Sequence, residues 1–568
     1  MEGEANRMWA STSFVGVLLI IGVPLWWKTT EVYRVALPYD KINAFDTESH
    51  FITSEVTVLA NDDQTANNIA DLLKKEFEQF DVIKLKINKQ ILTENLRNAL
   101  DKVTEEQEAL EEVDAVFNTK LHNSFYVVQR KPLFKDVWIG TERVAFFRDS
   151  KAAPIVVEAL KNWIYEPSVL HGARSEKADA ARQVRFPSED GFHVVLSVVH
   201  PKPQNMKVDF TAGEAVEDYI GSFVDELTDL HNFTLKSQWL HLLEFKLQTA
   251  ELVTLYLCVN LNVADYIGSF VDELTDLHNF TLKSQWLHLL EFKLQTAEVL
   301  EASSWGRHFP ARHDLLPQLL TRLEERAATP VSDKPVVNLA LYVVPCDVAP
   351  LAIYDSRDIR VMSPVQAFMS PKWGGVVFGN PTKTECEQKH YTPDVKLIMG
   401  TFISQLRKLL GITEKVKIPG GHLEPLWSVV PRRWEVDTLL RIRTLEQVSS
   451  AERSLKSLAK LLGEISNIVI NDEVGASINH AVDSIHKSRS LMISGDLLNA
   501  YRQSQQAFLA AETAFMEPSL LALLYFPDDQ KYAIYIPLFL PIMFPVILSL
   551  KNLIDWFRGK PSRKLKTD

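Results

Sequence analysis

The stretch "YAIYIPLFLPIMFPVILSL", Tyr532 to Leu550, decides how we expect this chain to be built. Its nineteen residues carry no charge, and about 20 apolar residues in a helix cross the roughly 30 Å hydrocarbon core of a bilayer. Proline nevertheless recurs at Pro537, Pro541 and Pro545. Each proline lacks the N–H that would donate to the carbonyl four residues earlier, so that carbonyl loses its helical hydrogen bond. A spacing of four residues places the three proline rings on one stripe of the helix. Because freed carbonyls are costly in lipid, we expect this packing stripe to face protein, with an isolated kinked helix as the alternative.

A second uncharged run, "MWASTSFVGVLLIIGVPLWW" (Met8 to Trp27), lies near the start of the chain. It is also long enough to cross a bilayer. A cleaved signal peptide would need small residues at its cleavage point. This run ends in two tryptophans followed by Lys28, which favours an uncleaved anchor with an aromatic belt.

Basic residues after the second run predict its orientation, because Lys and Arg are enriched on the cytosolic side of a membrane. We therefore expect both termini in the cytosol of an endoplasmic reticulum membrane protein with two spans, and the bulk of the chain in the lumen. Lys564 and Lys566 have the spacing of a dilysine retrieval signal, although a tail selected for charge alone would often contain it. Arg7 is a candidate contact for a lipid headgroup, with a plain topology charge as the simpler reading. The basic residues in question are Lys551, Arg558, Lys560, Arg563, Lys564 and Lys566.

The composition is that of a folded protein, with 46% hydrophobic and 24% charged residues among 568. A net charge of -12 argues against nucleic acid as a partner, because phosphate binding needs clustered Lys and Arg.

Hydrophobic periodicity predicts an α/β lumenal domain plus a helical C-terminal region, anchored by two transmembrane helices. Six short runs rich in Val, Ile and aromatics read as strands: "SEVTVLA", "VIKLKI", "SFYVVQR", "HVVLSVV", "VVNLALYVV" and "GGVVFGN". Amphipathic helical runs separate them, among them "LTENLRNALDKVTEEQEALEEV" (92–113) and "VKLIMGTFISQLRKLLG" (395–411). From Trp434 to about Leu524 we find helical patterns alone. The predicted segments are a cytosolic N-terminus (1–7), a first span (8–27), a lumenal α/β domain (28–420), a lumenal helical region (421–531), a second span (532–550) and a basic cytosolic tail (551–568).

A perfect duplication interrupts the α/β region. The 34 residues at 218–251 recur unchanged at 265–298, with "LVTLYLCVNLNVA" between them. Two perfect copies do not make a solenoid, which needs at least three units. A duplicated exon or a sequence-assembly error is the favoured origin. Each copy carries an N-glycosylation sequon, at Asn232 and Asn279, and we expect both to be usable in a lumen.

Three cysteines cannot form a disulfide framework. Cys346 and Cys386 are candidates for one bridge in an oxidising lumen, with three unpaired thiols as an equally weighted alternative. His390 lies near this pair in sequence, which we take as coincidence, and Cys258 lies between the duplicated copies. No hydrolase, zinc, P-loop or dinucleotide motif occurs. We predict no catalytic residue, no cofactor and no metal site.

Four long strings closely resemble the PIG-S family, a subunit of the GPI transamidase complex. They are "GVPLWWKTTEVYRVALPY" (Gly22 to Tyr39), "SPKWGGVVFGN" (Ser370 to Asn380), "LLGEISNIVINDEV" (Leu461 to Val474) and "LLYFPDDQKYAIYIPLFLP" (Leu523 to Pro541). The resemblance runs from the first apolar run to the last and departs at the duplicated block.

The resemblance implies a place in the endoplasmic reticulum machine that cleaves the C-terminal signal of a proprotein and joins the new carboxyl end to GPI. In that family the Cys and His chemistry belongs to PIG-K, with PIG-T, PIG-U and GPAA1 as further partners. The chain would then be a structural or regulatory component that meets the proprotein and the GPI lipid through the complex, beside membrane lipids. A membrane-anchored lumenal enzyme acting on glycans or lipids is the alternative, and a free-standing receptor or adhesion module is a third class.

Overall fold

The computed structural model describes most of the chain. The described residues are 2–22, 33–45, 50–175, 191–227, 232–241, 306–317, 335–426, 429–465 and 468–518, together with short pieces at 24–25, 28, 185–186, 300–302, 320, 520 and parts of 533–558. The chain divides into two compact units. The larger holds residues 51–443 and 493–498, and the smaller holds 1–50, 444–492 and 499–568. Each is described by itself.

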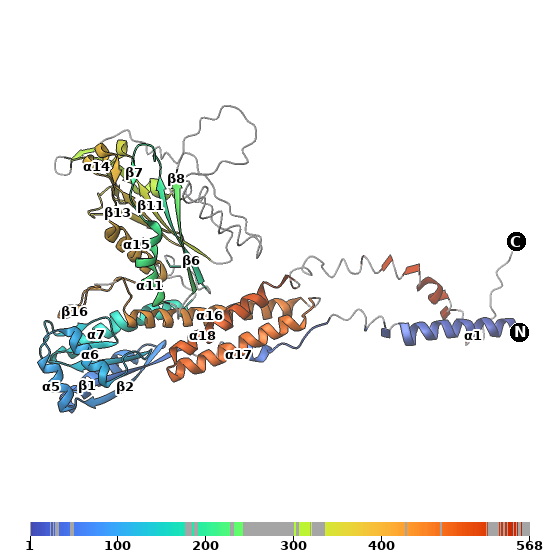
Figure 1. Cartoon of the computed structure of the whole chain (residues 1–568). Coiled ribbons are helices and arrows are strands. Elements are labelled where there is room, and N and C mark those ends of the chain that lie inside the picture. The colour runs from blue at the N-terminus through green and yellow to red at the C-terminus, as the bar shows by residue number, and fades with distance from the viewer. Residues whose placement is uncertain are drawn as a thin grey trace, which may run out of the picture. The chain divides into compact units, whose positions relative to one another are not determined.

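A six-stranded sheet opens the larger unit, in the order β16-β4-β5-β3-β1-β2 (Figure 1). Its centre is parallel: β1 pairs with β2 and with β3, and β3 pairs with β5. Strand β4 is antiparallel to β5 and parallel to β16. The strands are β1 (Ile52–Ala60), β2 (Ile83–Ile91), β3 (Ser124–Gln129), β4 (Val137–Ile139), β5 (Val144–Phe147) and β16 (Gly421–Leu423).

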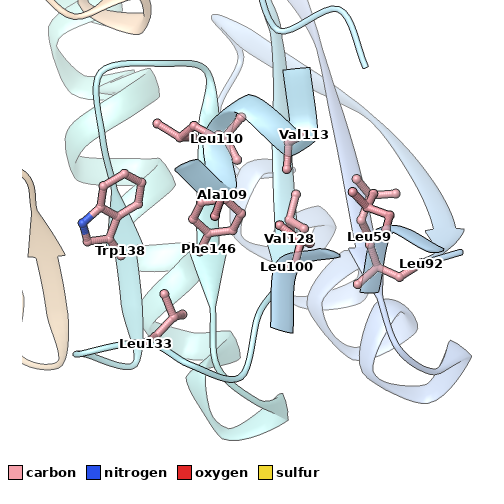
Figure 2. Close-up of a cluster of buried hydrophobic side chains, with 12 residues drawn as sticks. Leu59, Leu92, Leu100, Ala109, Leu110, Val113, Val128, Leu133, Trp138 and Phe146 are labelled. Carbon is pink, nitrogen blue, oxygen red and sulfur yellow. The ribbon is translucent and has the colours of Figure 1, made fainter. Parts of the chain in front are cut away.

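Helices α5 (Glu94–Lys102) and α6 (Glu106–Val116) bury their apolar sides against this sheet. Figure 2 shows Leu100 of α5 and Leu110 of α6 beside Val128 of β3 and Phe146 of β5. Full burial of one such side chain contributes about 1.5–3 kcal/mol, so this cluster stabilises the packing of the two helices on the sheet. The other helices of this part are α4 (Asp63–Phe77), η3 (Ser150–Ala152), α7 (Ala153–Ala159), η4 (Leu160–Tyr165) and α8 (Pro167–Arg174).

A five-stranded sheet, in the order β13-β14-β11-β6-β8, forms the rest of the larger unit. Its strands are parallel except for β13, which pairs with β14 in antiparallel register. Helix α15 (Val395–Leu410) packs on β14 through buried residues that include Met399, Phe402 and Leu406. The strands are β6 (Gly191–His200), β8 (Asn232–His241), β11 (Val336–Val343), β13 (Gln366–Ser370) and β14 (Gly374–Gly379).

Shorter elements complete the larger unit. A three-stranded sheet has the order β12-β10-β9, and β15 pairs with β7. These strands are β7 (Lys207–Val208), β9 (Leu300–Ala302), β10 (Gly306–Arg312), β12 (Leu351–Tyr354) and β15 (His390–Tyr391). The short helices are α10 (Ala212–Ala215), η5 (Val216–Gly221), α11 (Ser222–Asp225), η6 (His313–Leu315), η7 (Cys346–Val348) and α14 (Lys383–Gln388).

The smaller unit is helical. It contains α3 (Tyr39–Ala44), the part of α16 (Arg433–Glu464) after Arg443, and most of α17 (Asp472–Ser494) and α18 (Leu497–Phe515), which run side by side (Figure 1). Polar contacts join them: Ser504 Oγ of α18 donates to Gln447 Oε1 of α16 at 2.7 Å, and Ser488 Oγ of α17 donates to the carbonyl of Ala500 at 2.8 Å.

The expectation of two transmembrane helices, at 8–27 and 532–550, is wrong. Among the residues that the structure describes, no helix combines the length and the apolar character that crossing a membrane requires. Helix α1 runs from Glu2 to Val17, sixteen residues that include Glu4 and Arg7, and the π-helical turn η1 (Leu18–Gly22) follows it. Counting apolar residues along a sequence does not show where a helix begins and where it ends. The mixed α/β region and the helical C-terminal region are observed.

Candidate functional site

The carboxyl ends of β6 and β11 lie side by side in the five-stranded sheet of the larger unit. The two strands are parallel neighbours, paired from Val336↔His193 to Tyr342↔Val199. The chain that leaves β6 returns to the sheet as β8 on one side, and the chain that leaves β11 returns as β13 and β14 on the other. Where connections diverge in this way, a crevice opens beyond the strand ends, and ligands of open α/β sheets bind in such crevices.

A cavity of about 370 Å³ lies at this place, and we call it the carboxyl-edge cavity. Its size falls within the range of small-molecule sites. It is lined by His200, Lys202, Asn205, Met206, Val343, Pro345, Cys346 and Asp347. The lining therefore comes from two segments, one directly after β6 and one directly after β11.

A disulfide forms one wall of the carboxyl-edge cavity. Cys346, in η7, is bonded to Cys386, in α14, with their Cα atoms 5.8 Å apart. The bond joins the segment that follows β11 to the segment that follows β14, and it spans 40 residues of sequence. Cys346 Sγ also lies 4.0 Å from Met206 Sδ. A cysteine held in a disulfide has no thiolate to offer, so this sulfur shapes the cavity and is not a nucleophile.

Two charged side chains of the cavity lining pair with each other. Lys202 Nζ donates to Asp347 Oδ2 at 2.9 Å, and both side chains reach solvent. His200 is buried, with 3% of its surface exposed. A cation, a carboxylate and an imidazole thus line the cavity together with the apolar side chains of Met206 and Val343, a combination typical of sites for small molecules.

Tyr391, in β15, lies close to the same edge of the sheet. Burial, helped by the negative charge of Glu385, raises the pKa of Tyr391 to about 12. Its phenol therefore stays protonated at physiological pH. A side chain at Gly379 would meet the Tyr391 hydroxyl at 3.0 Å, which explains the glycine at the end of β14.

A second hollow, the β13–α15 groove, has a volume of about 380 Å³. It lies between edge strand β13, the segment 361–365 before it, and helix α15. Gln405 Nε2 donates to the carbonyl of Phe368 at 3.0 Å, so α15 covers part of the strand edge. Leu397 is 43% exposed beside it. This groove offers mainly apolar contacts.

Asp437, near the start of α16, is the centre of a buried ionic cluster in the larger unit. Arg143 donates to both of its carboxylate oxygens, and His122 Nδ1 lies 2.9 Å from Oδ1. Burial alone would raise the pKa of Asp437, but the hydrogen bonds from Arg143 and His122 outweigh it and hold that pKa well below its usual range. With Asp437 and Arg143 each only 2% exposed, the cluster anchors the helix and is not open to a substrate.

The predicted site residues are spread over the chain. Asn232 is the first residue of β8, paired with Gly191. Pro537, Pro541 and Pro545 are helical and exposed. Arg7 belongs to α1. The remaining ones, Asn279, Lys564 and Lys566, lie outside the described residues, as does Cys258.

Sequence reasoning missed Lys202, Asp347 and His200. The signal that could have found them is their position, because polar residues directly after two buried parallel strands meet at one edge of the sheet. In the described part of the chain, no group of three or more His, Cys, Asp or Glu residues is arranged to hold a metal ion.

The fold defines an α/β protein with a helical C-terminal unit, and comparison with known proteins supplies the family. The family described as "Phosphatidylinositol-glycan biosynthesis class S protein" matches residues 13–257 and 258–560. This chain belongs to the PIG-S family.

Relatives span nearly the whole chain. The "GPI-anchor transamidase component PIGS" of Homo sapiens is 30% identical over 601 residues, covering 98% of this chain and 97% of the human protein. The "GPI transamidase component PIG-S homolog" of Schizosaccharomyces pombe is 23% identical over 560 residues, covering 98% and 86%. The "GPI transamidase component GPI17" of Saccharomyces cerevisiae is 20% identical over 596 residues, covering 100% and 95%.

Proposed function

We propose that this chain is a component of the GPI transamidase, the complex that attaches GPI anchors to the C-terminus of proproteins. The observation that carries the proposal is full-length similarity: the human relative named as a transamidase component is matched over 98% of this chain and 97% of its own length. Both units of the chain lie within that match. The role therefore belongs to the whole polypeptide and not to one domain of it.

Within the complex the chain has a structural or regulatory role, and the bond-making groups reside on another subunit. The Cys346–Cys386 disulfide supports this assignment, because it removes two of the three cysteines of the chain from nucleophilic chemistry. PIG-K, PIG-T, PIG-U and GPAA1 are the proposed partners. The chain meets the proprotein and the GPI lipid through the complex.

The endoplasmic reticulum is the proposed location. A disulfide persists in an oxidising compartment and is rare in the cytosol. Asn232 and Asn279 are proposed glycan sites there. Lys564 and Lys566 are proposed to retain the protein in that compartment, and Arg7 is proposed to contact a lipid headgroup.

The test is depletion of the chain from cells of its own source. GPI proproteins are expected to accumulate uncleaved and to be processed again when the full chain is returned. A variant with Cys346 and Cys386 both changed to Ser separates folding from function, since its abundance can be compared with its processing activity. Normal processing in cells that lack the chain contradicts the proposal.

The purified full chain, incubated alone with proprotein and GPI, is expected to show no transamidation. Turnover by the isolated chain of a glycan or lipid substrate would instead favour the enzyme alternative. In that case the carboxyl-edge cavity is the first place to substitute residues, beginning with Lys202→Ala.

A further inference from the structure

Strand β13 forms one edge of the five-stranded sheet (Figure 1). It pairs with β14 on one side, and none of the strands that the structure describes pairs with its other side. The outer edge of a sheet presents backbone N–H and C=O groups that can form a ladder with another chain. The direction and surroundings of these groups on β13 indicate what kind of partner fits.

The neighbouring strand β14 shows how the ladder is oriented. Asn338 N of β11 donates to the carbonyl of Trp373, and Val344 N, directly after β11, donates to the carbonyl of Gly379, both at 2.9 Å. Residues with odd numbers along β14 therefore direct their backbone groups toward β11. Because these groups alternate in direction along a strand, residues with even numbers direct theirs toward β13.

Two residues of β13 direct their backbone groups outward. The register pairs the even-numbered residues of β14 with Gln366, Phe368 and Ser370, whose N–H and C=O groups thus form the ladder with β14. Ala367 and Met369 lie between them, so their N–H and C=O groups point away from the sheet. This edge therefore offers donors and acceptors at the spacing of a strand.

Helix α15 forms a wall beside this edge. Met369 lies opposite Gly375 in the register, and the side chains of opposite residues share one face of a sheet. A Cβ on Gly375 would meet Gln405 Oε1 of α15 at 1.9 Å, so α15 covers that face. Ala367 and Met369 also line the β13–α15 groove. A strand added to β13 would therefore direct every second side chain into the groove.

The groove is suited to apolar side chains and a carboxylate. Leu397 of its lining is 43% exposed, and Met362, in the segment before β13, is 65% exposed. Lys408 is the charged residue of the lining. Lys408 Nζ lies 2.7 Å from Glu414 Oε1, but the two side chains are 44% and 82% exposed, and such a pair contributes little. Lys408 is thus available to a carboxylate of a partner.

The composition of β13 lacks the usual protection of an exposed edge. Natural edge strands avoid unwanted pairing through charged residues, especially lysine, and through proline. Strand β2, at the edge of the six-stranded sheet, carries Lys84, Lys86 and Lys89. The sequence of β13, "QAFMS", contains no charged residue and no proline. Strand β13 therefore has the composition of a strand that is covered by a partner.

We propose that an extended segment of another subunit pairs with the outer edge of β13 and adds a strand to the sheet. The backbone of this segment bonds to Ala367 and Met369, its alternate apolar side chains contact Leu397, and a carboxylate meets Lys408. Main-chain hydrogen bonds of this kind supply affinity, and the contacts of alternate side chains supply specificity. The source of the segment rests on the proposed function, because that function supplies the other subunits, whereas the pairing rests on the edge of β13.

Photocrosslinking in the assembled complex tests the pairing. A benzophenone amino acid replaces Leu397 in the full chain, and mass spectrometry identifies the crosslinked peptide after purification in mild detergent. The expected product joins position 397 to a segment of another subunit that contains alternate apolar residues and Asp or Glu. The same amino acid at Val416, which is 70% exposed and outside the groove lining, is the control. Crosslinks only to this chain or to a second copy of it overturn the proposal, as does the absence of a crosslink.

Two proline variants separate the edge from the fold. Ala367→Pro removes an outward N–H and leaves the ladder with β14 intact, which is how edge strands tolerate proline. It is expected to keep the thermal midpoint within about 3 °C of the parent. The crosslink yield is expected to fall about three- to tenfold, because a hydrogen bond to the partner is lost. Phe368→Pro is the matched control, since it removes an inward N–H and should lower the midpoint. An unchanged crosslink yield in Ala367→Pro contradicts the proposal.

Charge reversal at Lys408 gives an independent readout. A synthetic peptide of the crosslinked segment is titrated against the purified full chain. Lys408→Glu is expected to weaken its binding about two- to fivefold, and a peptide with Lys in place of its acidic residue should restore binding to that variant. Equal binding of the original peptide by the parent and by Lys408→Glu contradicts the proposal.

The two proposals fail in different ways. If the proposed function is wrong, cells that lack the chain process GPI proproteins normally. If the pairing alone is wrong, processing still requires the chain, but position 397 gives no crosslink to another subunit.

Discussion

Arg143 and Asp437, 294 residues apart in sequence, form a two-point ion pair. Arg143 Nε donates to Asp437 Oδ2 at 2.6 Å, and Arg143 Nη2 donates to Oδ1 at 2.8 Å. Arg143 directly precedes β5, and Asp437 belongs to the first turns of α16. The pair thus fixes the start of a C-terminal helix to a strand of the N-terminal sheet.

Asp437→Asn is expected to destabilise the larger unit by about 3–5 kcal/mol, because it leaves the buried Arg143 guanidinium without its counter-charge. Urea unfolding of the purified chain measures the loss. Asp483→Asn is the matched control, since Asp483 is 59% exposed in a pair with Lys41, and an exposed pair contributes about 0–1 kcal/mol. Equal effects of the two changes would contradict the role given to Arg143 and Asp437.

Acid is expected to remove the contribution of the same pair. The pKa of Asp437 is lowered in the folded chain, so its stabilisation is fully present above the unfolded value, about 3.9, and declines as the pH falls below it. Between pH 5 and pH 3, the parent should therefore lose more unfolding free energy than Asp437→Asn. Parallel losses in parent and variant would show that other carboxylates account for the whole acid response.

Removal of the Cys346–Cys386 bond is expected to lower the free energy of unfolding by about 2–4 kcal/mol, because the bond restricts the unfolded chain. The measurement compares the parent with the double Cys→Ser variant. A reducing agent serves as the control: it should lower the thermal midpoint of the parent and leave that of the variant unchanged. A parent that is insensitive to reduction would show that the two sulfurs are not bonded in solution.

Replacement of Pro537, Pro541 and Pro545 together by Leu is expected to weaken copurification with partner subunits. These prolines are exposed in the isolated chain, and each leaves a carbonyl without its helical donor, which a partner can satisfy. Quantitative mass spectrometry after affinity purification in mild detergent provides the readout. Leu540→Ala, at a nearby exposed position, is the control. If the triple variant copurifies as much of the partner subunits as the parent does, the packing stripe does not contact those subunits.

Contraction of the duplicated block is expected to preserve the fold. Deletion of residues 252–298 and deletion of residues 218–264 yield the same polypeptide, which retains one copy joined directly to Val299. Because β6 lies between β11 and β8, and the first copy supplies β8, one copy completes the sheet. The shortened chain should keep or raise the thermal midpoint, since a long insertion no longer has to be closed. A large drop in the midpoint would mean that both copies support the structure.

Much of the secondary structure could be predicted from local pattern. The runs "SEVTVLA" and "SFYVVQR" correspond to β1 and β3, and "VKLIMGTFISQLRKLLG" becomes α15, which ends at Leu410 and is capped by Gly411 with φ 111°. Such elements are encoded by residues close in sequence, through the periods of 2 and 3.6. One helical run broke where it was expected to continue, since α5 ends at Lys102 and α6 begins at Glu106.

The carboxyl-edge cavity could not be predicted in the same way. Its lining joins segment 200–206 to segment 343–347, and only the pairing of β6 with β11 brings them together. The cysteine pairing was left open between a bridge and free thiols, because spacing along the chain does not report distance in space. The transmembrane prediction was wrong for a related reason, since apolar composition over twenty residues does not guarantee one uninterrupted helix.

By itself, then, the sequence determined the strands, the main helices, the family resemblance and the identity of the two block copies, all of which depend on residue order alone. The tertiary structure decided which strands are neighbours, which loops share an edge, and that Arg143 reaches Asp437. These are contacts between residues far apart in the chain, and the free energy that selects them comes from burial and pairing that exist only after folding.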